Sequence, residues 1–222
     1  MSRPMTWHQL CRALDARDGP FRDCRIALTL GVPSAERRGP ARRWRSLPPE
    51  ERYRASRLLI RWLLTTLTAG SVRPQAWILA RSASGRPRVL GPVSGFHASL
   101  AYAETACVVS VARQRTVGVD LEMWSPPPLD DMPRHLFSSR EMALLDADPE
   151  LFLTLWTLKE ALAKECGEGL VNDPGRFETA TYAAAPAGVA CRRADGGTAF
   201  HGRFHLGGQC YVLAHTLSPP LI

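Results

Sequence analysis

The longest helical pattern in the chain runs from about residue 50 to residue 68. Its apolar side chains recur at three- and four-residue spacings, as on one face of an α-helix, and they are Leu58, Leu59, Trp62, Leu63 and Leu67. Glu50 and Glu51 precede them, and negative charge in the first turn favours a helix start. The pattern therefore predicts a core helix in the first half of the chain.

A second long helix is predicted between Asp148 and Gly167. Asp148-Pro149-Glu150 supplies a capping residue, a proline at the first helical position and an early acid, and Gly167 is a common type of helix end. Before it, the residues S-S-R-E at 138–141 form a capping box that opens a shorter helix through Leu145. We therefore expect one short and one long helix in the second half of the chain.

Short apolar runs predict strands in both halves. These runs cover residues 25–30, 76–80, 107–111, 117–122, 199–206 and 209–216. The last two flank Gly207-Gly208, which predicts a hairpin. We therefore predict an α+β fold of two similar halves with pseudo-two-fold symmetry, each a long helix packed on a small, mainly antiparallel sheet. Residues 1–114 would form the first domain and residues 115–222 the second.

The composition is typical of a soluble globular protein, because 45% of the 222 residues are hydrophobic and 22% are charged. A formal net charge of +7 favours an anionic partner, such as a nucleotide cofactor, an acidic protein or a nucleic acid. The arginines are spread along the chain and partly clustered at residues 37–54, and the sequence has no zinc-finger spacing. We therefore do not expect a nucleic-acid partner.

The six cysteines lie far apart in the sequence, and no two of them form a C-x-x-C pair. This spacing argues against structural zinc and against a disulfide scaffold, and it suits reduced thiols. The N-terminus has no apolar run of signal-peptide length, and the longest apolar segment, residues 58–67, is too short to span a bilayer. We therefore expect a cytoplasmic protein without a membrane partner.

The second long helix also carries candidate chemistry. Of the 28 lysines and arginines in the chain, only Lys159 and Lys164 are lysines. Trp156, Glu160 and Lys164 fall on one helical stripe, because they are four residues apart. A compact ammonium group suits a site that must meet a single phosphate oxygen or a leaving group. An ordinary surface helix with charge pairs at four-residue spacing is the alternative.

Two further acids fall on one face of the strand predicted at residues 117–122. Asp120 and Glu122 alternate with apolar residues and lie about 6.6 Å apart along the strand. With Glu160 they give three carboxylates from two elements, and hard oxygen ligands of this kind suit Mg²⁺ beside a phosphate. The sequence has no Walker loop, no G-x-G-x-x-G and no G-x-S-x-G, which disfavours P-loop, dinucleotide-binding and serine-hydrolase functions.

The segments V-G-V-D-L-E at 117–122 and W-T-L-K-E-A-L-A-K at 156–164 together resemble the paired signatures of the 4′-phosphopantetheinyl transferases. The similarity covers roughly residues 50–216 and points to the larger, monomeric, surfactin-type branch, whose fold has two similar halves. Gly85-Arg86-Pro87 followed by Phe96 resembles the G-K-P…F-N-x-S-H-S region of the family. The resemblance implies transfer of the phosphopantetheine arm of coenzyme A to a serine of an acyl or peptidyl carrier protein, in polyketide or nonribosomal peptide biosynthesis.

The resemblance also implies a role for each matching residue. It assigns Mg²⁺ to three carboxylates, Asp120, Glu122 and Glu160. Glu160 would also help to deprotonate the carrier serine, and Lys164 would offset charge on the pyrophosphate or its leaving group. Lys159 would lie near the cofactor, Trp156 would pack the helix, and Arg86 would lie near the 3′-phosphate of coenzyme A. The positive charge of the chain would suit carrier proteins, which are typically acidic.

One segment departs from the family pattern. Where the family has F-N-x-S-H-S, this chain has F-H-A-S-L-A at residues 96–101. Leu100 and Ala101 replace a histidine and a serine that donate hydrogen bonds to coenzyme A, which leaves His97 and Ser99 as candidate donors. Two alternatives stay open. In the first, the fold serves another step, such as cyclisation, elimination or hydrolysis of a carrier-tethered or free intermediate, with coenzyme A use lost. In the second, it is a non-catalytic carrier-binding protein.

Overall fold

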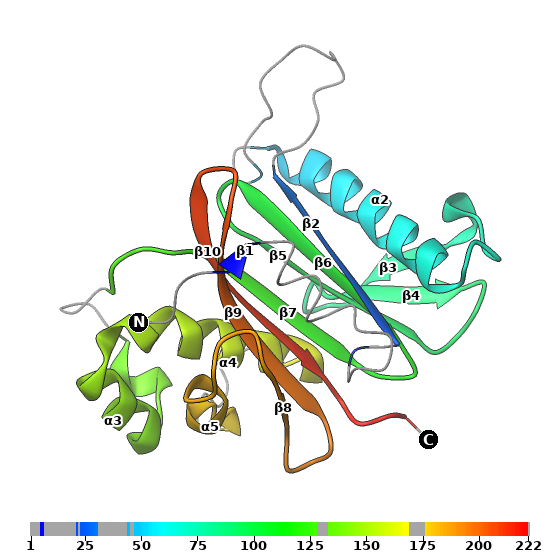
Figure 1. Ribbon diagram of the computed structural model, residues 1–222. Coiled ribbons are helices and arrows are strands. Elements are labelled where there is room, and N and C mark those ends of the chain that lie inside the picture. Colours follow the sequence, from blue (N-terminus) through cyan, green and yellow to red (C-terminus); the bar gives the residue numbers. More distant parts are fainter. Residues whose placement is uncertain are drawn as a thin grey trace.

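The protein forms two five-stranded sheets, each covered by one long helix (Figure 1). The computed structural model describes residues 5–6, 21, 23–30, 44, 47–127, 133–168 and 176–221. Within these residues no helix combines the length and the apolarity that crossing a bilayer requires. The predicted α+β fold of two similar halves is therefore confirmed, because each half pairs one long helix with one sheet.

The sheet of the first half is antiparallel throughout. Its order is β2-β6-β5-β4-β3, with β2 (Cys24–Leu30), β3 (Ile78–Arg81), β4 (Pro87–Gly91), β5 (Phe96–Tyr102) and β6 (Ala106–Arg113). Helix α2 (Pro49–Leu67) packs on β6 and β2 and buries Ile60, Leu63 and Leu64. The strand predicted at 76–80 begins two residues later, because residues 74–76 form a 3₁₀ turn, η2 (Pro74–Ala76).

The sheet of the second half has the order β1-β9-β10-β7, and β8 also pairs with β9. The strands are β1 (Met5–Thr6), β7 (Val117–Met123), β8 (Ala190–Arg192), β9 (Thr198–Leu206) and β10 (Gln209–Leu217). The pair β1 and β9 is parallel and the other pairs are antiparallel. The predicted hairpin is confirmed, since Gly207 and Gly208 join β9 to β10 with positive φ angles.

The helices of the second half begin and end close to the predicted residues. They are η3 (Arg134–Leu136), α3 (Ser139–Ala147), η4 (Pro149–Leu151), α4 (Phe152–Cys166) and α5 (Ala180–Ala183). The capping box of α3 is confirmed, because Ser138 Oγ accepts from Glu141 N and Glu141 Oε2 accepts from Ser138 N. Gly167 ends α4 with a φ of 81°. Helix α4 packs on β7 and β10.

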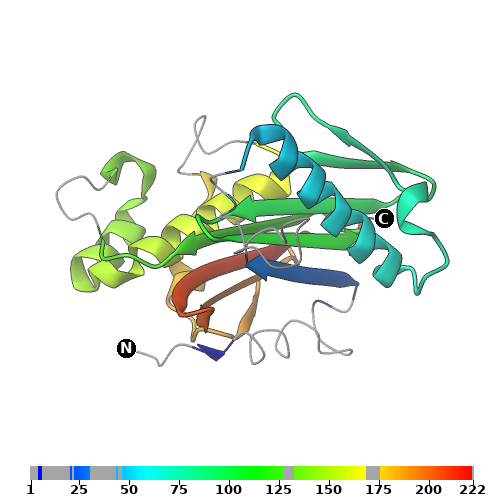
Figure 2. The ribbon, with the colours of Figure 1, turned by 90° about the horizontal axis from the view of Figure 1, so that it is seen from above.

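The two sheets share one hydrophobic core, and we call the contact between them the seam. Core residues come from both halves, among them Val108 and Ala112 of β6 and Val119 and Leu121 of β7. Strand β7 lies alongside β5, as the green strands of Figure 2 show, and Ser99 Oγ accepts a hydrogen bond from Val119 N at 3.1 Å. The position 114/115 falls between β6 and β7, but β1 joins the second sheet, so the division into two domains stays a prediction.

Candidate active site

Helix α4 places the predicted stripe of functional side chains at the edge of the core. Its buried face is formed by Leu155, Leu158, Ala161 and Leu162, whereas Trp156, Glu160 and Lys164 are half-buried. The Trp156 ring stacks on Phe152 with ring centroids 6.4 Å apart. Trp156 therefore packs the helix, as expected, and Glu160 and Lys164 are the polar members of the stripe.

An ion pair joins the stripe to strand β7. Lys164 Nζ lies 2.6 Å from Asp120 Oδ1, with the two side chains 29% and 6% exposed. Gly118 explains this close approach, since a Cβ at that position would lie 1.8 Å from the carbonyl oxygen of Ala161. The second oxygen, Asp120 Oδ2, is buried and has no hydrogen-bond partner among the residues that the structure describes. Such an oxygen is costly to bury, and it is suited to a ligand that supplies positive charge or a proton.

Glu160 belongs to the same group of charges. Burial raises the pKa of the Glu160 carboxyl group, the nearby Asp120 raises it further, and Lys164 partly offsets the increase. A carboxylate whose pKa is raised towards neutrality is a better proton acceptor. Glu160, with its raised pKa, and Asp120 therefore present two carboxylates beside one ammonium group.

Glu160 and Lys164 face a cleft that both halves of the molecule line, and we call it the central cleft. The first half contributes the 84–87 turn with Ser99 and Leu100, and the second half contributes Glu160, Ala163, Lys164, Gly167 and Glu168. An adjoining hollow shares Ser84, Arg86, Pro87 and Gly167 and adds Phe96 and His97. The residues that the sequence placed in two separate motifs thus lie around one depression.

Arg86 reaches from the first half across to the end of α4. Its Nη1 atom would lie 2.9 Å from a Cβ at Gly167, so glycine there serves both the left-handed backbone and this approach. Its Nη2 atom is buried without a hydrogen-bond partner, and burial lowers the pKa of the guanidinium group. An unpaired buried guanidinium nitrogen at the wall of a cleft is suited to an anion, above all a carboxylate or a phosphate.

The remaining predicted cofactor residues differ in accessibility. His97 lines the adjoining hollow, and burial together with the nearby Arg86 lowers the pKa of its imidazole. It is therefore neutral at pH 7. Ser99 is 2% exposed and already accepts the Val119 N–H, so its hydroxyl both lines the cleft and ties β5 to β7. Leu100 lines the central cleft, whereas Ala101 is buried in the shared core.

The placement of Lys159 does not support the expected contact with the cofactor. Lys159 is fully buried, its Nζ atom lies 2.8 Å from Glu141 Oε2, and it donates to the carbonyl oxygen of Phe177 at 2.8 Å. Lys159 follows Leu158 on the buried face of α4, so its ammonium group points into the protein and away from the stripe that includes Lys164. The sequence pattern could not reveal this, because Glu141 lies on another helix.

The predicted Mg²⁺ site stays a prediction. In the described part of the chain, no three His, Cys, Asp or Glu side chains converge as a ready-made metal site. Asp120 and Glu160 are close neighbours, and the unpartnered Asp120 Oδ2 fits a small hard cation whose other ligands are water and an anionic substrate. Glu122 is half-buried on the same strand face as Asp120, and its role as a ligand stays a prediction.

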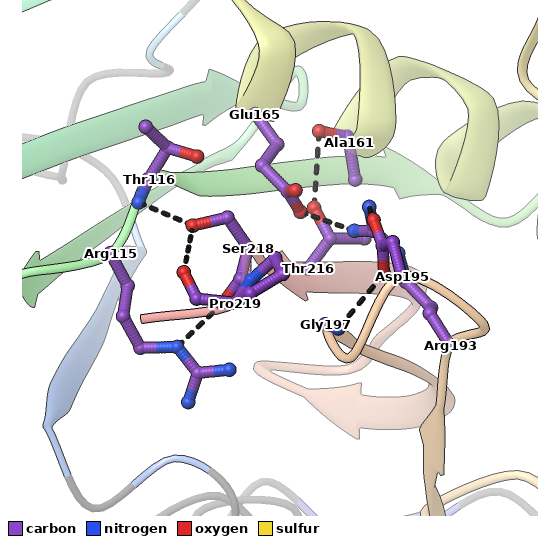
Figure 3. Close-up of polar contacts among 10 residues, drawn as sticks. All are labelled: Arg115, Thr116, Ala161, Glu165, Arg193, Asp195, Gly197, Thr216, Ser218 and Pro219. Carbon is purple, nitrogen blue, oxygen red and sulfur yellow. Dashed lines mark hydrogen bonds and ion pairs between the residues drawn. The ribbon is translucent and has the colours of Figure 1, made fainter. Parts of the chain in front are cut away.

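Sequence reasoning missed an ion pair that fixes the end of α4. Glu165, the residue after Lys164, is 3% exposed, and its Oε2 atom accepts from Arg193 Nη1 at 2.6 Å (Figure 3). Arg193 also pairs with Asp195, and Thr216 Oγ1 donates to the carbonyl oxygen of Ala161 at 3.3 Å. These contacts attach α4 to the 193–197 turn and to β10. No sequence motif marks Arg193, because it is remote from α4 along the chain.

The fold is a pseudo-two-fold α+β fold with a cleft between its halves, and Arg86 and Lys164 line that cleft. Residues 116–214, which lie within the second half of the chain, match the model of the 4′-phosphopantetheinyl transferase superfamily. The chain is also 31% identical over 85 residues to the 4′-phosphopantetheinyl transferase HetI of Nostoc sp. (strain PCC 7120). The aligned part covers 36% of this chain and 36% of that protein, about a third of its length.

Proposed function

We propose that the protein is a 4′-phosphopantetheinyl transferase that uses coenzyme A and modifies a serine of an acyl or peptidyl carrier protein. The observation that carries this proposal is the convergence of Glu160 and Lys164, from the part that matches the superfamily, with Arg86 on one cleft. Arg86 and Lys164 provide two cations for a cosubstrate that carries several phosphates. The proposed surfactin-type branch agrees with the two-half fold.

The transfer step assigns a task to each group. The carrier serine Oγ attacks the phosphorus atom that bears the pantetheine arm, and the P–O bond to adenosine 3′,5′-bisphosphate breaks. Glu160, directly or through water, accepts the serine proton, a role that its raised pKa favours. Lys164 stabilises the charge that develops on the leaving phosphate. Arg86 binds the 3′-phosphate from the opposite wall of the cleft.

Asp120 and Glu160 would hold Mg²⁺, with Glu122 as a further candidate ligand. The ion would neutralise charge on the pyrophosphate when it is bound. The unpartnered Asp120 Oδ2 supports this assignment, because a buried carboxylate oxygen without a donor gains most from a cation. Asp120 and Glu160 belong to different elements, so the packing of β7 on α4 sets the distance between them.

The net charge of the chain supports an acidic carrier protein as the partner. The chain has a formal net charge of +7, which favours association with acidic carrier proteins through long-range attraction. We also propose that the protein acts as a monomer in the cytoplasm, in the biosynthesis of polyketides or nonribosomal peptides. A monomer agrees with the geometry, because both walls of the central cleft come from one chain.

A second candidate function is favoured by Leu100. This apolar side chain lies in a cleft whose other walls carry Arg86, Glu160 and Lys164, at a position where the family pattern has a hydrogen-bond donor. A related enzyme that no longer uses coenzyme A would keep the acid and the lysine. It would use them as acid and base in cyclisation, elimination or hydrolysis of a carrier-tethered or free intermediate.

Intact-protein mass spectrometry of an apo carrier protein tests the proposal. The carrier is incubated with the protein, Mg²⁺ and coenzyme A, and transfer adds about 340 Da to the nucleophilic serine. Glu160→Gln serves as the negative control, because glutamine preserves the shape of the side chain and cannot accept the proton. If a surfactin-type enzyme modifies a panel of carriers that this protein leaves unchanged, the transferase assignment fails and the second candidate takes its place.

A further inference from the structure

Lys164 and a divalent cation would need the same carboxylate. Asp120 has one ammonium partner at 2.6 Å and one oxygen without a partner, and its side chain is only 6% exposed. A cation bound to this carboxylate would therefore lie within a few ångströms of the Lys164 ammonium group. At such distances, in a partly buried site, like charges repel each other strongly. The cation and the ammonium group therefore cannot both keep close contacts with Asp120.

The cleft offers the ammonium group another place. Glu168 lies just beyond the end of α4 and lines the same cleft, and its side chain is 47% exposed and paired with Arg176. Glu160 precedes Lys164 by one turn on the same side. Because lysine has a flexible four-carbon stem and Lys164 is partly exposed, its ammonium group can leave Asp120 without unpacking α4.

We propose that Lys164 is an exchangeable counterion of Asp120. Without metal, the ammonium group neutralises the buried carboxylate. When a divalent cation binds Asp120, it displaces the ammonium group towards the cleft, where the group faces an anionic substrate. Metal binding would then prepare the lysine for the substrate, so the cation and the anion would bind cooperatively. This inference rests on the metal site of the proposed function and not on the transfer reaction itself.

The sequence provides an internal control for observing the displacement. Lys159 and Lys164 are the only lysines of the chain, so protein labelled with ¹³C-lysine gives two sets of Cε–Hε signals in an NMR spectrum. Lys159 is fully buried in its pair with Glu141 and should not respond to metal. Titration with Mg²⁺ should shift the Lys164 signals and leave the Lys159 signals in place. Unchanged signals of both lysines at saturating Mg²⁺ would contradict the proposal.

The affinity for Mn²⁺ gives a second readout that does not depend on activity. Free Mn²⁺ is measured by electron paramagnetic resonance with the wild-type protein and with Lys164→Gln. Removing the competing ammonium group should tighten Mn²⁺ binding by roughly tenfold or more. Arg54→Gln is the matched control, because it removes one exposed positive charge on the other long helix, α2. It should change the affinity by less than about twofold, since the exposed charge is screened.

Asp120→Asn separates the two proposals. If Mn²⁺ binds the wild-type protein and the variant equally, or binds neither, the metal is not on Asp120 and the metal part of the proposed function fails together with this inference. If binding depends on Asp120 but Lys164→Gln leaves the affinity unchanged or weaker, only the exchange of counterions is wrong. Transfer to the carrier, followed by mass spectrometry, is measured independently of both results.

Discussion

The two lysines of helix α4 lie in opposite environments. Lys159 is fully buried, and its ammonium group contacts a carboxylate and a carbonyl oxygen in an otherwise apolar region. Lys164 is 29% exposed, and it contacts a carboxylate that keeps one oxygen unpartnered. The Lys159 ammonium group makes its contacts inside the protein, so it is not placed to bind a ligand. The pair of Lys164 and Asp120 leaves one carboxylate oxygen available to a ligand, which is why we place the chemistry at Lys164.

The largest expected effect is on stability, at Lys159. Replacing Lys159 by Met leaves the Glu141 carboxylate buried without its cation, and breaking a buried ion pair typically costs about 3–5 kcal/mol. Glu141 still accepts from the backbone N–H and the hydroxyl of Thr179, so the charge is not fully stranded. Urea denaturation measures the free energy of unfolding. A loss below about 1 kcal/mol, the range of surface pairs, would show that the pair contributes little.

Replacing Lys164 by Met should have a smaller effect on stability than the change at Lys159 and a large effect on activity. Lys164→Met leaves the buried Asp120 carboxylate without its cation, but Lys164 is 29% exposed and water can replace part of its contact, so the loss of free energy of unfolding should be smaller than at Lys159, below about 3 kcal/mol. The rate of phosphopantetheine transfer should fall roughly 100-fold, because one positioned charge at the leaving group is worth about 2.7 kcal/mol. Time courses of carrier modification measure the rate. If the rate is retained while stability falls, Lys164 is a structural residue and the comparison of the two lysines is reversed.

A buried histidine at the seam should make the stability of the protein depend on pH. His215 lies in the shared core, where Ser110 Oγ is 2.7 Å and Cys24 Sγ is 3.5 Å from its Nε2 atom, and burial lowers its pKa to about 3. An unfolded histidine has a pKa near 6.5. Between these values the unfolded chain binds a proton that the native protein does not, so stability falls as the pH falls. The expected loss from pH 6.5 to 5 is about 2 kcal/mol.

The contribution of His215 is isolated by comparing pH profiles. His215→Gln should lower stability at pH 7, and its free energy of unfolding should depend less on pH between 6.5 and 5 than that of the wild type. The buried His201, whose pKa is also lowered by burial, titrates in both proteins and cancels in the difference. Parallel profiles for the two proteins would mean that the imidazole of His215 is protonated without cost.

The sequence predicted the elements of this fold better than their contacts. The capping box at Ser138 and the helix end at Gly167 are local signals, so both were found at the correct residues. The 3₁₀ turn at residues 149–151 was not predicted, although the capping Asp148 was, because the same residues can open either type of helix. The pairing of β1 with β9 joins the two ends of the chain, and local patterns carry no information on it.

For the candidate site, too, the sequence predicted which residues share one face of an element but not which residues they contact. The spacing of Glu160 and Lys164 fixed their shared stripe, and the alternation at Asp120 and Glu122 fixed their shared strand face. The sequence could not reveal that Lys159 turns inward, because the buried Glu141 that pairs with it belongs to α3. Nor could it show that Arg193 anchors the next residue, Glu165. Long-range partners decided which of the charged residues are structural.

The smallest expected effect is at Leu100, on the wall of the first half. Leu100→His introduces a donor into the central cleft, and one hydrogen bond is worth about 0.5–1.5 kcal/mol, or about two- to thirteenfold in coenzyme A affinity by calorimetry. Ala101→Ser is the matched control and should bring no gain, because Ala101 faces the shared core and a hydroxyl there cannot reach the cleft. Equal gains from both changes would mean that β5 presents its other face to the cofactor. No gain from either would mean that Leu100 itself contacts the substrate, as the second candidate function requires.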